Sequence, residues 1–193
     1  MAKWTPVPDW QVAQIQRPDW SARPVPGLSM VLVGGRIDLA IAALAPDAEG
    51  LGLWQIATGG AQAIRIGRDK ALIVTGRAVA IQHGWNRDGW SATAAESAFG
   101  AIDITGPALG DIVSEATAAD IDTGSRSAAV LFAGIPCLLT RIAHDTARVV
   151  TEAGFIPYLW RWLETRQEGC TNPSPKALPP AGSVPHGAPS QSP

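Results

Sequence analysis

Apolar residues in the middle of the chain follow the same order of strand-like and helix-like spacing twice. An apolar run at residues 29–33 is followed by a Gly-Gly turn. Over residues 37–44, apolar side chains then take the i, i+3, i+4 and i+7 spacing of an amphipathic helix. The second series repeats this order with an apolar run at residues 99–105, a Gly-Pro pair and the same helical spacing over residues 109–116. Each series therefore predicts a strand followed by a short helix.

Three further apolar runs rich in β-branched residues follow each predicted helix, so each unit is predicted to be β-α-β-β-β. Polar or glycine-containing corners between the runs are typical of hairpin turns. Helical spacing over residues 155–163 predicts a closing helix after the second unit, and residues 78–83 are a shorter candidate counterpart after the first. The six runs are residues 51–57, 62–66 and 71–75 in the first unit and residues 128–133, 137–142 and 147–151 in the second.

A direct repeat supports the prediction of two units. Residues 65–75 and 141–151 are identical at six of eleven positions, 76 residues apart, and similarity at a fixed offset is the signature of a duplicated unit. The predicted fold class is therefore α+β, with two pseudo-repeated β-α-β-β-β units packed together and a helix closing the second. The predicted boundaries are residues 28–84 for the first unit, 85–97 for a linker that loops around two tryptophans, and 98–166 for the second unit.

The two ends of the chain differ from this body in their proline content. Twelve of the sixteen prolines lie in residues 1–28 and 171–193. Proline fixes φ and cannot donate to a strand ladder, so residues 1–27 are predicted to be an extended arm. Residues 167–193 have few large apolar side chains and are predicted to be a disordered tail. The arm carries three tryptophans that either dock on another subunit or fold back over the chain's own body.

Charge, hydropathy and cysteine content exclude several classes of function. The net charge of −2, without a Lys/Arg cluster, predicts no binding to nucleic acid. No segment approaches the roughly 20 apolar residues of a membrane-spanning helix, and no secretion signal is apparent, so a cytoplasmic location is expected. Cys137 lies in an apolar strand and Cys170 in the tail. We therefore expect one buried and one exposed thiol, without a disulfide framework or a metal site.

One group of residues has the composition of a nucleophilic catalytic site, namely His83, Asp88, Ser91 and Ser97 in the predicted linker. Neither serine lies in a G-x-S-x-G elbow, and the surrounding segment rich in glycine and tryptophan favours a packed loop. The chain is therefore predicted to carry no catalytic residues. The roles of its two tryptophans, Trp85 and Trp90, stay open.

Two further candidates have structural explanations. His144 and Asp145 occupy a predicted hairpin corner, where a turn aspartate accounts for the recurrence without catalysis, and His186 lies in the tail. Gly34-Gly35-Arg36 precedes a helix and resembles an anion cradle, but it lacks the spacing of dinucleotide or P-loop sites. A tight strand-to-helix turn is the favoured interpretation.

Several segments carry a family resemblance. They are IDITGPALGDIV at residues 102–113, AGIPCLL at residues 133–139, FIPYLWRWL at residues 155–163 and, in the first unit, IGRDKALIV at residues 66–74. Together they resemble the gamma subunit of heterotetrameric sarcosine oxidase, over roughly residues 28–165. That family shares its fold with folate-binding aminomethyltransferases, whose catalytic and folate-contacting acidic residues have no match in this chain.

The resemblance implies a small, non-catalytic subunit of a flavoenzyme that demethylates sarcosine oxidatively to glycine and transfers the one-carbon unit to tetrahydrofolate. FAD, FMN, NAD and tetrahydrofolate are expected in the alpha, beta and delta partner subunits, with no cofactor or metal in this chain. A stand-alone folate-binding or aminomethyltransferase-like protein is an alternative, as is a gamma-like subunit of a related N-methyl amino-acid dehydrogenase. The candidate partner-interface residues are Trp4, Trp10, Trp20 and Trp160.

Overall fold

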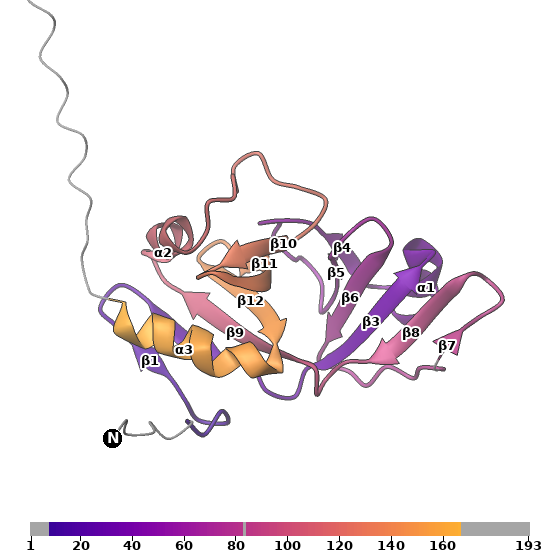
Figure 1. Ribbon diagram of the computed structural model, residues 1–193, viewed down its shortest axis with the longest axis horizontal. Helices are drawn as coiled ribbons and strands as arrows, with labels where there is room; N and C mark the ends of the chain where they lie inside the picture. Colours follow the sequence, from indigo (N-terminus) through magenta and orange to yellow (C-terminus); the bar gives the residue numbers. More distant parts are fainter. Residues whose placement is uncertain (1–7, 83, 167–193) are drawn as a thin grey trace, which may run out of the picture.

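The computed structural model describes residues 8–82 and 84–166 and is a mixed α+β structure built on two sheets (Figure 1). Sheet A has the strand order β1-β2-β9-β12-β11-β10, and sheet B has the order β4-β5-β6-β3-β8-β7. The elements are β1 Ile15–Gln16, β2 Ser21–Pro24, β3 Ser29–Gly35, α1 Ile37–Leu44, β4 Glu49–Leu51, β5 Ala61–Arg65, β6 Lys70–Thr75, β7 Gly84–Trp85, β8 Trp90–Ala94, β9 Phe99–Thr105, α2 Leu109–Ala116, β10 Ala129–Phe132, β11 Ile135–Ala143, β12 Thr146–Glu152, the 3-10 turn Ala153–Phe155 and α3 Ile156–Thr165.

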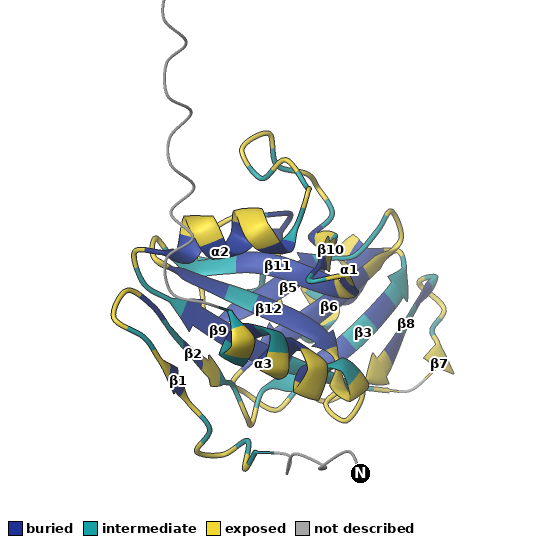
Figure 2. Ribbon diagram, turned by 60° about the vertical axis from the view of Figure 1, so that its left-hand side comes forward, coloured by how far each residue is buried: buried dark blue, intermediate teal, exposed yellow. Residues whose placement is uncertain are grey.

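Each sheet packs helices on one face and meets the other sheet on the opposite face. Alternate residues of β9, such as Ile102 and Ile104, pack against the apolar stripes of α2 and α3. In the same way, Val31 and Val33 of β3 pack against α1. A third cluster contains residues of both sheets, among them Met30, Leu72, Leu138 and Val150. Figure 2 shows α3 lying across the buried strands of sheet A. No helix within the described ranges is long and apolar enough to cross a membrane.

The two sheets have the same strand order when the predicted units are matched, because β3, β6, β5 and β4 follow one another as β9, β12, β11 and β10 do. Each sheet consists of four strands from one unit and a hairpin that lies, in the sequence, just before the other unit. The β1–β2 hairpin precedes β3 but pairs with β9, and the β7–β8 hairpin precedes β9 but pairs with β3. The two halves of the chain therefore exchange hairpins.

A short motif accompanies this exchange. Trp20-Ser21-Ala22 lies at the start of β2, with Trp20 just before the strand, and Trp90-Ser91-Ala92 begins β8, 70 residues later. Each tryptophan is buried in the cluster between its sheet and the helices of that sheet. The expectation that residues 85–97 form a loop is therefore wrong. The alternation that buries Trp90 and Ala92 makes this segment a strand that pairs with β3.

The expectation of an extended arm does not hold for residues 15–24, which form the β1–β2 hairpin of sheet A. Two other expected elements also differ from the structure. Residues 78–82 form no helix, because Val79 and Ile81 pack into the α1 cluster at a spacing of two residues instead of a helical spacing. The expected strand at residues 51–57 ends at Leu51. The segment beyond it crosses to the other sheet, where Trp54 N–H donates to Leu139 O at 3.3 Å and Ala57 N–H donates to Arg141 O at 2.8 Å.

Gly106 ends β9 where the chain must pass close to the β1–β2 hairpin. Its φ is +139°, and a Cβ atom at this position would lie 2.7 Å from Trp20 Cα and against the Asp19 carbonyl. We expect Gly106→Ala to lower the free energy of unfolding by at least about 1–3 kcal/mol, because alanine strains this backbone region. Chemical denaturation checks this value.

Gly110 supplies the matched control for that substitution. It lies inside α2 with open space around its Cα, and alanine is a better helix former than glycine. Gly110→Ala is therefore expected to raise the free energy of unfolding by about 0.5–1 kcal/mol. Equal effects of the two substitutions would contradict a close approach at Gly106.

Candidate functional site

Each hairpin is joined to the unit that follows it in the chain by a short connection, and the two connections cross between the sheets. Residues 25–28 run from β2 to β3, and residues 95–98 run from β8 to β9. The crossing is held by two equivalent hydrogen bonds. Val25 N–H donates to Ala101 O at 2.9 Å, and Ala95 N–H donates to Met30 O at 2.8 Å. Both connections are therefore fixed by the central strand of the opposite half.

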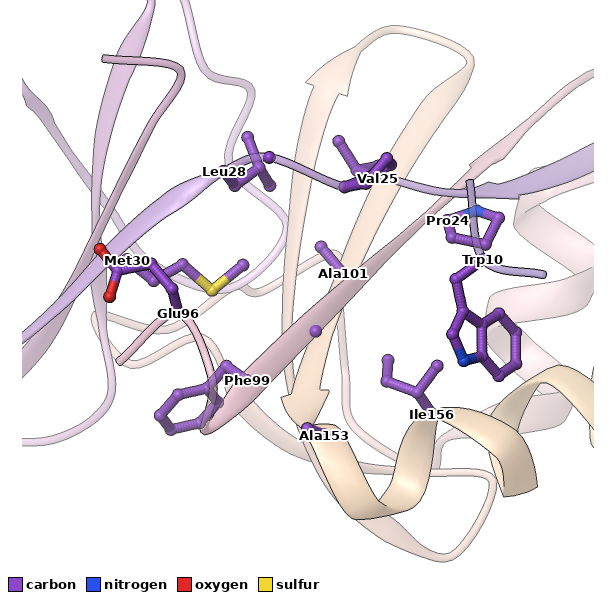
Figure 3. Close-up of a pocket in the computed structure, with 13 residues that line it drawn as sticks. Trp10, Pro24, Val25, Leu28, Met30, Glu96, Phe99, Ala101, Ala153 and Ile156 are labelled. Atoms are coloured by element: carbon purple, nitrogen blue, oxygen red, sulfur yellow. The ribbon is translucent and has the colours of Figure 1, made fainter. Parts of the chain in front are cut away.

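An apolar pocket of about 230 Å³ opens at this crossing, and we call it the crossing pocket (Figure 3). Trp10 and Ile156 lie at one side, and Met30 and Glu96 lie at the other. Among the described residues that line the pocket, Glu96 alone carries an ionisable group, and its carboxylate accepts a hydrogen bond of 3.1 Å from Ser29 Oγ. Apolar side chains that line the pocket include Trp10, Val25, Leu28, Met30, Phe99 and Ile156.

The wall formed by Trp10 is supported by two neighbouring groups. The ring of Trp10 packs edge to face on Trp160 of α3, with 5.7 Å between the ring centroids. A turn after Pro8 sets the direction of the chain, because the Val12 and Ala13 N–H groups both donate to Asp9 O. This packing holds the tryptophan side chain at the rim.

The predicted interface tryptophans have different environments. Trp10 is half-buried at the crossing pocket, whereas Trp20 and Trp160 are each 3% exposed within the core of sheet A and its helices. Trp4 lies outside the described residues. The structure therefore uses Trp20 and Trp160 to stabilise the chain's own second half. Of the two linker tryptophans, Trp90 is buried and Trp85 is 71% exposed.

The structure does not assemble the catalytic group considered from the sequence. Asp88 lies in the β7–β8 turn, Ser91 lies within β8, and Ser97 follows that strand. No side-chain hydrogen bond joins these three residues in the described part of the chain. His83, the fourth member of the group, lies outside the described residues, as does His186.

Backbone contacts explain the other two candidates. Gly35 N–H donates to Asp69 O at 2.9 Å and Arg36 N–H donates to Gly89 O at 3.0 Å, so these N–H groups are engaged within the chain and a tight turn is confirmed. In the second half, Gly106 N–H donates to Asp145 O at 2.9 Å. The recurring aspartates therefore mark equivalent turns. Within the described residues, no cluster of three His, Cys, Asp or Glu side chains has metal-site geometry.

An open depression between the halves was not predicted from the sequence. It is lined by Trp54, Ser125, Arg126 and Arg141, among others. Trp54 has φ +60°, and the Arg141 guanidinium lies 5.1 Å from the centroid of its ring. The strained tryptophan lies where residues 53–57 cross to β11, and it joins the two halves of the chain.

Cys137 is buried on β11, as expected, and burial raises the pKa of its thiol to about 11. Only the thiolate attacks reagents, so in a Cys170→Ser background we expect Cys137 of the native chain to resist a disulfide reagent at pH 8 and to react fully in urea. Rapid labelling of the native chain would contradict the burial.

The raised pKa of Cys137 also makes stability depend on pH. Because the folded pKa lies above the unfolded one, this group favours folding below about pH 9, and that contribution is lost as the pH rises towards 11.

One of the comparisons with known proteins found a match, to a solved structure. A chain of heterotetrameric sarcosine oxidase from Corynebacterium sp. U-96, solved in complex with pyrrole 2-carboxylate, matches this chain with a TM-score of 0.59 and 17% identity. The match covers 75% of this chain and 81% of the sarcosine oxidase chain. The two chains share a fold. No family model matches the sequence, and the search of curated proteins found no match.

Proposed function

We propose that this chain is a non-catalytic, gamma-type subunit of a heterotetrameric sarcosine oxidase complex. The observation that carries the proposal is the fold shared with a chain of such an enzyme. Because 75% of this chain matches 81% of the other, the two chains are similar in length, which favours a small subunit as the counterpart. The segments that resemble the gamma subunit lie mainly in β9, α2, β11 and α3.

In this proposal the chain contributes shape and stability to a complex that converts sarcosine to glycine. The alpha, beta and delta subunits hold FAD, FMN, NAD and tetrahydrofolate, and no bond is made or broken on this chain. The lining of the crossing pocket supports a packing role, because it is apolar apart from one carboxylate. Of the proposed interface tryptophans with a described side chain, Trp10 keeps the most exposed area.

The proposal includes an internal duplication related to the folate-binding aminomethyltransferase fold. Three observations support it, namely the common strand order of the two sheets, the paired Trp-Ser-Ala segments and the equivalent hydrogen bonds at the crossing. One strand pairing differs, because β4 is parallel to β5 whereas β10 is antiparallel to β11. The duplication gives the chain two similar sheets and leaves their outer surfaces free to diverge.

Co-purification tests the proposed function directly. The tagged chain is expressed in its native host and isolated under mild conditions, and the absorption spectrum of the purified product is recorded. We expect three further polypeptides and the bands of bound flavin. A colourless product that contains this chain alone would refute the assignment.

Assembly is also expected to stabilise the chain. Partners that bind only the folded form raise its stability by RT ln(1 + [L]/Kd), which is about 2.7 kcal/mol at 100 times Kd. The melting temperature of this chain should therefore rise when the purified partner subunits are added in excess. Equal melting temperatures with and without the partners would count against a subunit role.

The carboxylate in the crossing pocket favours one rival function, a stand-alone folate-binding or aminomethyltransferase-like protein. Such a protein needs an apolar pocket with an acidic group to receive a pterin ring, and Glu96 is placed in that way. Titration of the isolated chain with tetrahydrofolate distinguishes the two functions. Saturable binding that Glu96→Gln abolishes supports the rival, whereas the subunit proposal predicts no binding.

A further inference from the structure

We propose that the open depression between the two halves, lined by Trp54, Arg126 and Arg141, binds a small organic anion that carries at least two carboxylate or phosphate groups. This inference concerns the surface of the chain itself and does not depend on the proposed function. It follows from the shape of the depression, from the arginines around it and from the contacts that hold these arginines in place.

The depression continues into a second hollow, and we call the two together the arginine groove. The depression has a volume of about 610 Å³ and the hollow one of about 290 Å³, and Gln55 and Arg126 line both. Arg141 lines only the depression, whereas Arg65 lines only the hollow. Cations therefore lie at both ends and in the middle of a groove that has room for a small molecule.

The lining of the arginine groove has an excess of positive charge, although the net charge of the chain is −2. Asp122 is the one acidic residue among the described residues that line it, against three arginines. In the described part of the chain, no ion pair involves Arg126 or Arg141, and Arg65 has a single contact of 3.4 Å with the exposed Asp38 carboxylate. An anion in the groove therefore offsets the repulsion between these cations.

Arg141 is held in position before any ligand binds. Its guanidinium lies over the Trp54 ring, and its Nη2 donates to His144 O. Its Nε is buried and has no hydrogen-bond partner among the described residues, so the dipole of this N–H group adds to the positive potential of the wall. Trp54, at φ +60°, keeps a strained backbone at the same place, and such strain is often found at binding sites.

Arg126 is fixed by backbone contacts on both sides. Leu53 N–H donates to Ser125 O at 2.8 Å, and Ala128 N–H donates to Arg65 O at 2.6 Å, so the segment around Arg126 is tied to the first half of the chain. The Arg126 side chain itself is exposed. A guanidinium presents its N–H groups as a planar fork that matches carboxylate and phosphate oxygens, which favours these two classes of anion.

Isothermal titration calorimetry of the full-length chain with citrate and with pyrophosphate tests the proposal. Citrate is the probe for a carboxylate ligand and pyrophosphate the probe for a phosphate ligand. We expect saturable binding of at least one probe, weakened by added sodium chloride, and the tighter probe identifies the class of the ligand. If neither probe binds saturably at millimolar concentration, the proposal is overturned.

Two arginine variants locate the binding. Arg126→Ala should weaken binding of the tighter probe at least about tenfold, because charge-assisted hydrogen bonds to the anion are lost. Arg87→Ala is the matched control, because Arg87 is exposed in the β7–β8 turn at the far edge of sheet B, and it should leave the affinity unchanged. Circular dichroism verifies that both variants are folded. Equal affinities of the wild type and Arg126→Ala, or equal losses in the two variants, would place the anion outside the groove.

A third variant should change the affinity in the opposite direction. Asp122→Asn keeps the shape of the side chain and removes the one carboxylate from the described lining, so binding should become severalfold tighter at low salt. Weaker binding by this variant would contradict the proposed site. None of these measurements depends on flavin or on further subunits, so failure here leaves the outcome of the co-purification unaffected.

Discussion

Asp103→Ala is expected to lower the free energy of unfolding by about 3–5 kcal/mol. Asp103 is 2% exposed in the middle of β9, and its carboxylate binds the Arg148 side chain of β12 through two hydrogen bonds, of 2.7 Å to Nε and 2.9 Å to Nη2. Removing the carboxylate leaves the guanidinium of Arg148, whose side chain is 11% exposed, without its anion in a region of low dielectric. Urea unfolding followed by circular dichroism measures the loss.

Two other variants give that measurement its meaning. Asp47→Ala removes the acidic partner of Arg77 from a salt bridge whose side chains are both exposed, so its effect should stay within about 1 kcal/mol. In Asp103→Leu/Arg148→Met both charges are replaced by apolar groups, and most of the lost stability should return. If Asp103→Ala is no more harmful than Asp47→Ala, the buried pair does not stabilise sheet A.

Trp20→Ala should cost a comparable 3–5 kcal/mol, because a large buried aromatic side chain is replaced by a cavity. Trp20 is 3% exposed and anchors the β1–β2 hairpin on the sheet of the second half. The Arg166 guanidinium also lies 6.0 Å from the centroid of its ring. Thermal and urea unfolding both report this loss, and limited proteolysis should cut the hairpin first because its anchor is gone.

Trp85→Ala provides the comparison for the same residue type in the other hairpin. Its side chain is 71% exposed, so the substitution should change the free energy of unfolding by no more than about 0.5 kcal/mol. Similar losses for Trp20→Ala and Trp85→Ala would mean that the first hairpin does not depend on its buried tryptophan.

Most strands and helices of the two units could be predicted from local patterns of apolar residues in the sequence. Predicted runs such as residues 99–105 and 109–116 coincide with β9 and α2, since side-chain periodicity reflects which face of an element is buried. The closing helix over residues 155–163 corresponds to α3. The prediction for residues 85–97 was wrong because glycine, asparagine and tryptophan suggested a loop. The signal that would have corrected it was the second Trp-Ser-Ala segment, 70 residues after the first.

The candidate site could not be predicted from the sequence in the same way. The crossing pocket combines Trp10, Met30, Phe99 and Ile156, which are far apart in the sequence. No local pattern places them together, because their proximity depends on the exchange of hairpins and on the crossing of two connections. The pairing of Asp103 with Arg148 likewise depends on the register of β9 against β12. The sequence shows only a charged residue within each apolar strand.

The sequence by itself determined the order of strand and helix at the start of each unit, the closing helix and the duplication of a short segment, because each depends on neighbouring residues. Only the tertiary structure decided which hairpin completes which sheet, that Trp20 and Trp160 are buried within the chain, and where the apolar pocket opens. These features arise from contacts between distant residues, and such contacts are fixed by the packing of whole sheets instead of by local side-chain spacing.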